Sequence, residues 1–204
     1  MTGAVVLAAG GSSRLGQPKQ LLRVSGATLL ERTVDALLAD ARIWPVVVVL
    51  GASGPEVRAA VARRPVLFAE NAAWAEGMAS SLRTGLGTLR QFSRGVNAAL
   101  FALCDQPAFD VQVVRQLVDA YTRNPTGAVA AVYDGHAGAP AILSRDMFPA
   151  LEQLTGDQGA RKLLAQLPPS ALKTLDLPQL AIDVDTPEDL RLLGLTNLQT
   201  RPKL

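Results

Sequence analysis

Residues 1–22 read MTGAVVLAAGGSSRLGQPKQLL, a short apolar run followed by a loop of small residues that also carries Arg14 and Lys19. The run from Gly3 to Ala8 predicts a first β-strand, and the loop leaves the carboxyl end of that strand. Ligands of open α/β sheets bind beyond this end of the strands. Glycine and serine let backbone N–H groups approach phosphate oxygens, and the two cations add positive charge. The stretch therefore predicts an α/β fold with a phosphate-binding loop.

The rest of the chain alternates short apolar runs with segments of helical period, which indicates βαβ units and a mainly parallel sheet. The strands at 128–133 and 141–143 predict a hairpin or flap across a glycine-containing turn. We expect a Rossmann-like three-layer α/β sandwich with a small β flap, formed by one domain over residues 1–195 with a tail at 196–204. The predicted strands are 3–8, 45–50, 66–69, 98–103, 128–133, 141–143 and 181–185, and the predicted helices are 28–39, 80–92 and 110–121, with three more that begin at 53, 156 and 186.

The composition excludes several classes of protein. Of the 204 residues, 49% are apolar and 19% are charged, so the chain is expected to fold. A net charge of +2, with no basic cluster beyond Arg63-Arg64, argues against nucleic-acid binding. The one cysteine, Cys104, excludes an intrachain disulfide, and no apolar run approaches the roughly 20 residues of a membrane span. We expect a cytoplasmic protein with no nucleic-acid or membrane partner.

Two familiar phosphate-loop motifs do not match the opening loop. A Walker A loop ends in Gly-Lys-Ser/Thr, whereas Gly16 is followed here by Gln17. The dinucleotide fingerprint G-x-G-x-x-G is also absent from residues 10–16. A flexible turn with two surface cations is the alternative, but a strand, a small-residue loop and two cations in one block favour triphosphate binding.

The block from Leu7 to Lys19, LAAGGSSRLGQPK, resembles the signature loop of the nucleotidyltransferases that activate molybdopterin cofactors and sugar or isoprenoid phosphates. The resemblance implies that the loop binds the nucleotide through its phosphates, and that Arg14 and Lys19 act in catalysis by neutralising charge during transfer. The nucleotide-binding residues implied in this block are Leu7, Ala8, Ala9, Gly10, Gly11, Ser12, Ser13, Arg14 and Lys19.

A second block, residues 71–82, brings asparagine, tryptophan and glycine together before a helix. By itself it is typical of a loop with an anchoring tryptophan and a serine cap, although such side chains also contact nucleobases or pterins. It resembles the N-x-x-W-x-x-G-M-x-x-S-L block of the molybdenum-cofactor cytidylyltransferase branch. The resemblance implies that Gly77 and Ser81 lie near the nucleobase and that Trp74 contacts the second substrate.

Three aspartates are candidate metal ligands. Asp105 follows the strand at 98–103 on the ligand side of the sheet, with a turn or capping aspartate as the alternative. Mg²⁺ keeps part of its hydration and is shared with substrate phosphates, so one or two protein carboxylates suffice. Period two places Asp183 and Asp185 on one side of the predicted last strand, in a block that resembles the closing motif of the family. We expect Mg²⁺ as the cofactor and favour Asp185 over Asp183 as the second ligand; the alternative is that both open the last helix.

A third block, residues 156–161, opens a predicted helix and resembles the G-D-x-G-A-R block of the cytidylyl branch. A helix N-terminus with a nearby arginine suits a phosphate group. We therefore expect Gly156, Asp157 and Arg161 to bind the second substrate, with a capped helix and a solvent-exposed arginine as an equal alternative. Gly138-Ala139-Pro140 matches the flap motif of the family, and a plain β-turn is its alternative.

Some residues bear on nucleotide choice and on the mechanism. The Cys104-Asp105-Gln106-Pro107 sequence resembles the cytidylyl branch, and so does Ala9, where guanylyl-transferring relatives usually carry another glycine. A methyl group at position 9 also predicts less room beside the base, which suits a pyrimidine. Cys104 is expected to pack rather than to act as a nucleophile, because His136 is the sole candidate base. His136 lies in the predicted flap and is expected to be exposed and non-catalytic.

Together the blocks resemble this family from Val5 to about Leu193. The implied activity is Mg²⁺-dependent transfer of CMP from CTP to the molybdopterin-bound molybdenum cofactor, which gives molybdopterin cytosine dinucleotide and pyrophosphate. The expected partners are CTP, the molybdopterin cofactor and a molybdenum hydroxylase apo-enzyme. The alternatives are a related nucleotidyltransferase that uses GTP or a sugar or isoprenoid phosphate, and a non-catalytic carrier of the molybdenum cofactor.

Overall fold

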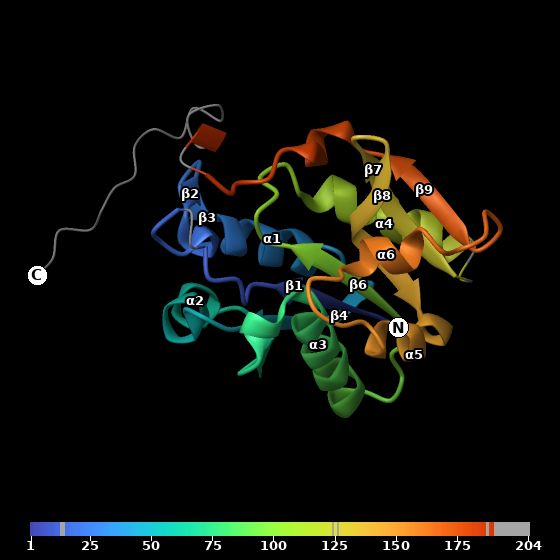
Figure 1. The fold of residues 1–204 in the computed structure, drawn as a ribbon, viewed down its shortest axis with the longest axis horizontal. Coiled ribbons are helices and arrows are strands. Elements are labelled where there is room, and N and C mark those ends of the chain that lie inside the picture. Colours follow the sequence, from blue (N-terminus) through green and yellow to red (C-terminus); the bar gives the residue numbers. More distant parts are fainter. Residues whose placement is uncertain (13–14, 124, 126, 187, 190–204) are drawn as a thin grey trace, which may run out of the picture.

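Seven strands form the main sheet, in the order β5-β4-β1-β6-β8-β7-β9 (Figure 1). The computed structural model describes residues 1–12, 15–123, 125, 127–186, 188 and 189. Neighbouring strands are parallel except β8, which runs antiparallel to both β6 and β7. A second, two-stranded sheet joins β2 and β3. The strands are β1 (Thr2–Leu7), β2 (Arg23–Val24), β3 (Ala27–Thr28), β4 (Ile43–Leu50), β5 (Leu67–Glu70), β6 (Ala98–Leu103), β7 (Ala128–Tyr133), β8 (His136–Ser144) and β9 (Leu172–Asp176).

Helices cover both faces of the main sheet (Figure 1). One face packs against α1, α2 and α4, and the other packs against α3, α5 and α6. The α-helices are α1 (Leu29–Leu38), α2 (Gly54–Val61), α3 (Met78–Phe92), α4 (Val111–Arg123), α5 (Phe148–Glu152) and α6 (Ala160–Leu164). The short 3-10 helices are η1 (Lys19–Leu21), η2 (Trp74–Glu76), η3 (Arg145–Met147) and η4 (Pro178–Ala181). The predicted three-layer α/β architecture with a mainly parallel sheet is confirmed.

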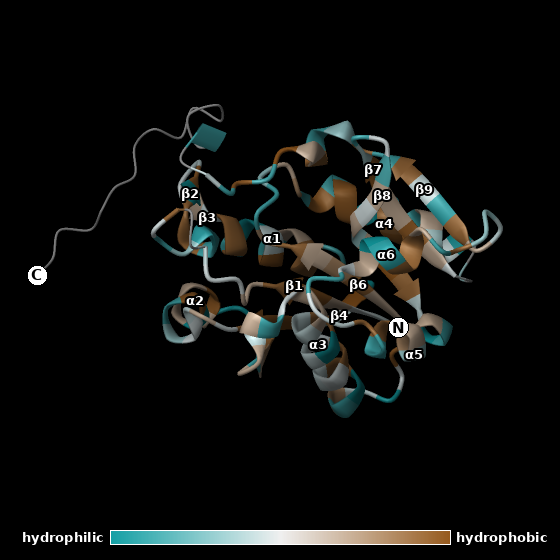
Figure 2. Ribbon diagram, in the orientation of Figure 1, coloured by the Kyte–Doolittle hydropathy of each residue, from teal (hydrophilic) through white to brown (hydrophobic). Residues whose placement is uncertain are grey.

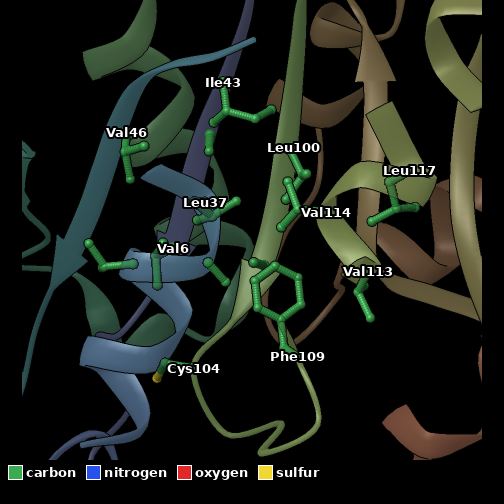
Figure 3. Packing of buried hydrophobic residues seen from close by; sticks show 14 of the residues in the cluster. Val6, Leu37, Ile43, Val46, Leu100, Cys104, Phe109, Val113, Val114 and Leu117 are labelled. Atoms are coloured by element: carbon green, nitrogen blue, oxygen red, sulfur yellow. The ribbon is translucent and has the colours of Figure 1, made fainter. Parts of the chain in front are cut away.

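The core follows the alternation of side chains along each strand. Val5 of β1 packs into one layer and Val6 into the other, as period two requires. Figure 3 shows Val6 and Leu100 in the layer that also holds Val114 of α4. The central strands are therefore buried on both faces and read as continuous apolar runs, which appear brown in Figure 2. This is why the run at 45–50 identified a strand correctly.

The first helix begins with a reciprocal pair of hydrogen bonds. The backbone N–H of Glu31 donates to Thr28 Oγ1 (3.1 Å), and the backbone N–H of Thr28 donates to Glu31 Oε2 (2.7 Å). This capping box satisfies backbone donors that have no partner inside the helix. Burial by itself would raise the pKa of Glu31, but hydrogen bonding from Thr28 to its carboxylate and the charge of Arg64 lower it below its ordinary value.

Thr28→Ala is expected to lower the free energy of unfolding by about 1 kcal/mol, because the Glu31 N–H loses its acceptor at the start of α1. Chemical denaturation measures this change. Thr28→Ser keeps the acceptor oxygen and serves as the matched control, with a smaller expected loss. Equal losses in the two variants would show that the Thr28 methyl group, not the cap, stabilises this end of α1.

Two other helix starts were also predicted correctly. Asp110 precedes α4, and its Oδ1 accepts hydrogen bonds from the backbone N–H groups of Gln112 and Val113. Pro55 lies in the first turn of α2, where its missing N–H costs nothing. Caps and prolines therefore placed these boundaries to within a residue or two.

The carboxyl-terminal strand was wrongly predicted. Residues 181–185 are not a strand: η4 ends at Ala181, and Val184 then donates its N–H to the Asp105 carbonyl (2.9 Å) instead of joining the sheet ladder. The edge strand β9 at Leu172–Asp176 was missed, because its exposed, partly polar sequence gives a weak strand signal. The predicted hairpin exists as β7 and β8, and it joins the main sheet through β8 rather than standing apart from it. The predicted tail at 196–204 lies outside the described residues.

In the described part of the chain, no helix has the length and apolar character to cross a membrane.

Candidate active site

One buried side chain, Gln20, fixes the loop that follows β1. Its Nε2 donates to the carbonyl oxygens of Ala8 and Gly10, both at 2.9 Å. Gln20 lies in η1 and is 1% exposed, so water does not compete for these bonds. They tie the glycine-rich loop to η1 and give it one fixed path. A fixed path is what a preorganised phosphate site requires.

The far side of the loop is anchored through Ser12. The backbone N–H of Lys19 donates to Ser12 Oγ (2.9 Å), and the N–H of Leu15 donates to the Ser12 carbonyl (3.0 Å). Ser12 has a φ of 48°, in the left-handed region that residues other than glycine rarely adopt. Gly10 and Gly11 are both exposed, and nothing lies within 4 Å of the place where a side chain on Gly10 would begin. The loop therefore offers an open stretch of backbone between two fixed points.

Lys19 places its ammonium group between two carboxylates. Its Nζ lies 2.5 Å from Asp105 Oδ2 and 2.7 Å from Asp185 Oδ1. Burial by itself would lower the pKa of Lys19, but the two carboxylates, above all Asp105, raise it above its ordinary value. Lys19 is therefore charged at neutral pH and lies beside the carboxyl end of β6.

A third aspartate lies against this cluster. Burial, reinforced by the Asp105 carboxylate, raises the pKa of Asp183 to about 7. One oxygen of Asp105 and one of Asp183, Oδ1 in each case, is buried without a hydrogen-bond partner among the described residues. A buried acceptor without a donor is costly, so these oxygens favour a cation or a proton. The bond from Val184 to the Asp105 carbonyl brings the closing segment to this place.

The loop before α3 is organised by Asn71. Its Nδ2 donates to the hydroxyl groups of Ser80 (2.9 Å) and Ser81 (3.0 Å), and its Oδ1 accepts from the N–H of Ala73 (3.0 Å). The Ser81 hydroxyl thus serves the loop itself, and the residue is only 6% exposed. Trp74 lies against the phosphate loop, because a Cβ on Gly11 would come within 3.2 Å of its ring. The structure thus places Trp74 beside the expected nucleotide site.

The second and third sequence blocks meet at Gly77. A Cβ at this position would lie 2.5 Å from the Gly156 carbonyl and from Asp157 Oδ1, and the φ of Gly77 is +108°. The N–H of Ala79, in the first turn of α3, donates to the Gly156 carbonyl (3.0 Å). Any side chain at 77 would push these segments apart. Gly77 therefore joins the two blocks by close backbone contact.

A cavity of about 240 Å³ opens where these segments meet the sheet. Leu7 and Leu103, at the carboxyl ends of β1 and β6, form part of its mainly apolar wall. Arg161 supplies a cation at this cavity, and His136 lines it as an exposed residue. The phosphate loop directly follows Leu7 in the sequence, and Asp105 follows shortly after Leu103. The cavity is suited to an organic molecule that carries an anionic group.

Gln106 connects Asp105 with the walls of this cavity. Its Nε2 lies within hydrogen-bonding distance of Tyr133 Oη (3.2 Å) and of the carbonyls of Ala139 (3.4 Å) and Leu180 (3.1 Å). Tyr133 and Ala139 both line the cavity. Gln106 is 2% exposed, so it acts as a buried brace between β6, the β7–β8 hairpin and η4.

The structure brings most of the expected site residues together. Lys19, Asp105 and Asp185 form one cluster, while Asp157 and Arg161 share the adjacent cavity. Ser13 and Arg14 lie outside the described residues, so the role of Arg14 stays a prediction. Sequence reasoning missed Gln20, whose amide group carries no motif signal, and it noted Asn71 only as the first residue of the second block. The missed brace Gln106 was noted only for its likeness to the cytidylyl branch.

Two expectations about single residues have different outcomes. The Ala9 methyl group does not face an open site: Ala9 is 4% exposed and packs in the core, and Gly51 must lack a side chain to fit against it. The steric argument for a pyrimidine at this position was therefore wrong. Cys104 is buried in the core as expected, and burial raises the pKa of its thiol to about 12. Such a thiol is not a nucleophile at neutral pH.

Charge, not a nucleophile, is what this site supplies. The one histidine of the sequence is exposed and the one cysteine is buried. A fixed loop and a charged lysine beside carboxylates suit a substrate that is already activated, as in the transfer of a nucleotide from its triphosphate. The fold and the site thus define a nucleotidyltransferase. Residues 4–171 match the family model of the MobA-like NTP transferase domain, and the chain belongs to this family.

Known relatives cover most of the chain. It is 34% identical over 173 residues to nicotine blue oxidoreductase of Paenarthrobacter nicotinovorans. The aligned region spans 80% of this chain and 81% of the relative. It is 22% identical to molybdenum cofactor cytidylyltransferase of Escherichia coli over 91% of each chain. Among solved structures, Rv0371c of Mycobacterium tuberculosis superimposes with a TM-score of 0.79 at 31% identity, over 96% of this chain and 98% of that one. Rv0371c has also been solved in complex with manganese.

Proposed function

We propose that this nucleotidyltransferase transfers CMP from CTP to the terminal phosphate of the molybdopterin-bound molybdenum cofactor. The observation that carries the proposal is the contact between charged Lys19, which is bonded to the phosphate loop, and Asp105, which follows the β6 end that lines the Arg161 cavity. A triphosphate on the loop and an organic phosphate in the cavity then meet at the ends of β1 and β6. The molybdenum cofactor cytidylyltransferase of Escherichia coli, similar over 91% of each chain, supports this choice of substrate.

The reaction needs little from the protein besides positioning and charge. A phosphate oxygen of molybdopterin attacks the α-phosphorus of CTP, the bond to the β-phosphate breaks, and pyrophosphate leaves. The attacking phosphate is already ionised at pH 7, so no general base is required. Lys19 and the loop amides stabilise the charge that grows on the α-phosphoryl group and on the leaving pyrophosphate. Buried hydrogen bonds of Gln20 fix the phosphate loop, and those of Gln106 fix the wall of the cavity.

We further propose that Asp105 and Asp183 hold a Mg²⁺ ion. Their buried Oδ1 atoms, which lack partners among the described residues, form a hard-oxygen donor pair that fits this ion. The side chain of Asp185 is 45% exposed and has no such buried oxygen, so it is the weaker candidate. Two protein carboxylates suffice for Mg²⁺, which keeps part of its hydration and is shared with substrate phosphates. Bound Mg²⁺ would supply positive charge at the phosphates.

The native protein is expected to use CTP at least about tenfold better than GTP, as discrimination of roughly 1–3 kcal/mol by a shaped site allows. The measurement is kcat/KM for each nucleotide with one molybdopterin preparation, followed by pyrophosphate release. Ala9→Gly is the companion variant. Because the Ala9 methyl packs against Gly51 and not into the site, a gain of GTP use would require a shift of the loop backbone. Equal use of CTP and GTP by the native protein would contradict the cytidylyl assignment.

A redox function is the second candidate, because the relative at 34% identity carries the name nicotine blue oxidoreductase. Hydride transfer requires a nicotinamide or flavin cofactor. The G-x-G-x-x-G fingerprint of such cofactors is absent from residues 10–16, which favours nucleotidyl transfer. Oxidation of NADH or NADPH in the presence of a quinonoid dye, without pyrophosphate release from CTP, would reverse this preference.

A further inference from the structure

A second cavity lies at the other end of α3. It measures about 450 Å³, and its wall includes Arg90, Arg94 and Arg145 together with Gly87, Gln91 and Val96. Met78, the first residue of α3, lines the candidate active site, whereas the second cavity uses the last turns of the helix. Figure 1 shows these two ends of α3 well apart. The volume is sufficient for a small organic ligand.

Positive charge at this cavity is only partly compensated. Arg90 forms an ion pair with Glu152, but Arg94 and Arg145 have no acidic partner within the described ranges. No residue of the cavity wall is acidic. The carboxyl end of α3 is itself partially negative, so the arginines and not the helix attract an anion here.

Arg145 is held in place by the neighbouring loop. Its Nη1 donates to the Arg94 carbonyl (3.0 Å), and its backbone N–H donates to the Asn97 carbonyl (2.8 Å). These bonds bring the guanidinium of Arg145, from the start of η3, to the loop that carries Arg94. The guanidinium of Arg145 is thus held at the cavity, where Arg94 supplies a second positive charge.

Gly87 lies in the wall of the cavity, and no close packing within the protein requires a glycine at this position. A Cβ on Gly85 would lie 2.3 Å from Val5 Cγ1, so the close contact of α3 with β1 requires this glycine. A Cβ on Gly87 would have no atom within 4 Å. Glycine in a helix is destabilising relative to alanine, and burial against the sheet does not explain Gly87. Its missing side chain does leave the helix surface open toward the cavity.

We propose that this cavity is a second ligand site, which binds a small multiply charged oxyanion against Arg94, Arg145 and the open surface at Gly87. The planar guanidinium fork pairs with phosphate and carboxylate groups in the same bidentate way. The ligand class is therefore a phosphate ester or a polycarboxylate. The site is separate from the phosphate loop, which lies at the other end of α3.

The test uses the ¹⁵N-labelled full chain, titrated with inorganic triphosphate in one series and citrate in another, with backbone amide shifts as the readout. The amides of Gly87, Gln91 and Gly95 report on this cavity, and those of Gly10 and Gly11 report on the phosphate loop. Arg94→Gln/Arg145→Gln removes two charges at the cavity. Arg63→Gln/Arg123→Gln removes two exposed charges elsewhere and is the matched control. Gly87→Ala adds a methyl group at the cavity without a steric clash in the protein.

We expect saturable shifts at Gly87, Gln91 and Gly95 with at least one probe. The affinity should be unchanged in the control and weaker by about tenfold or more in the arginine variant, because two charge-assisted contacts are lost. Gly87→Ala should also weaken binding, with a thermal midpoint that is unchanged or higher. Preference for triphosphate identifies a phosphate ligand, and preference for citrate identifies a polycarboxylate. Absence of saturable shifts with both probes, or equal affinity in the arginine variant, overturns the proposal.

Discussion

Lys19→Ala is expected to lower kcat by about two to three orders of magnitude while the chain still folds. The ammonium group lies at the end of the phosphate loop, and its pKa is raised by Asp105 and Asp185, so it is charged whenever substrate binds. A contact to charge that grows in the transition state is typically worth about 2.7–4 kcal/mol. Steady-state pyrophosphate release measures the loss, and circular dichroism checks the fold.

Two control variants separate this role from a general effect of charge. Lys19→Arg keeps the charge but cannot place it identically between Asp105 and Asp185, so partial activity is expected. Lys173→Ala removes an exposed lysine from the edge strand β9 and should leave kcat unchanged. A folded Lys19→Ala protein with near-native kcat would reduce Lys19 to a partner of the two aspartates.

The sheet was predictable because its strands are buried on both faces. A run such as 45–50 has no alternative to a core strand, and Asp110 or Thr28 before an apolar segment marks where a helix begins. The end of the chain gave weaker signals. Asp183-Val184-Asp185 alternates like a strand, yet its backbone donates to the Asp105 carbonyl and to Asp189 Oδ2 instead of to a neighbouring strand. Tertiary contact, not local propensity, decides such a segment.

The site was predictable where charge or glycine marked it, and not where it depends on packing. The sequence placed Lys19 in the loop after the first strand and Asp105 after the strand at 98–103, and the structure brings their side chains to 2.5 Å from each other. Period two could not rank Asp183 against Asp185, because their difference lies in which carboxylate is buried and which contacts Lys19. Ala9 was misjudged for a similar reason: whether its methyl faces the core or a ligand depends on Gly51, which is distant in sequence.

Asp105→Asn is expected to lower kcat by about a hundredfold or more, and to remove the dependence of activity on Mg²⁺. The asparagine keeps the shape of the side chain but loses the charge that the proposed ion needs, and a metal at transferring phosphates is worth several kcal/mol. Lys19 still contacts Asp185 at 2.7 Å and stays protonated at pH 7, since the ordinary lysine pKa is about 10.4. Loss of the Mg²⁺ dependence therefore reports on the metal, whereas a lower kcat with the native Mg²⁺ dependence would report on the position of Lys19. Activity is titrated with Mg²⁺, and Mn²⁺ binding is followed by electron paramagnetic resonance.

The remaining aspartates decide which carboxylate completes the metal site. Asp183→Asn should raise the Mg²⁺ concentration needed for half-maximal activity, because its buried Oδ1 is the proposed second ligand atom. Asp185→Asn should change the Mg²⁺ requirement less, since this carboxylate contacts Lys19. Asp176→Asn, at the exposed end of β9, is the matched control and should behave as the native protein. A native Mg²⁺ dependence in Asp105→Asn would remove Asp105 from the metal site, and a larger effect at Asp185 than at Asp183 would reverse the choice between them.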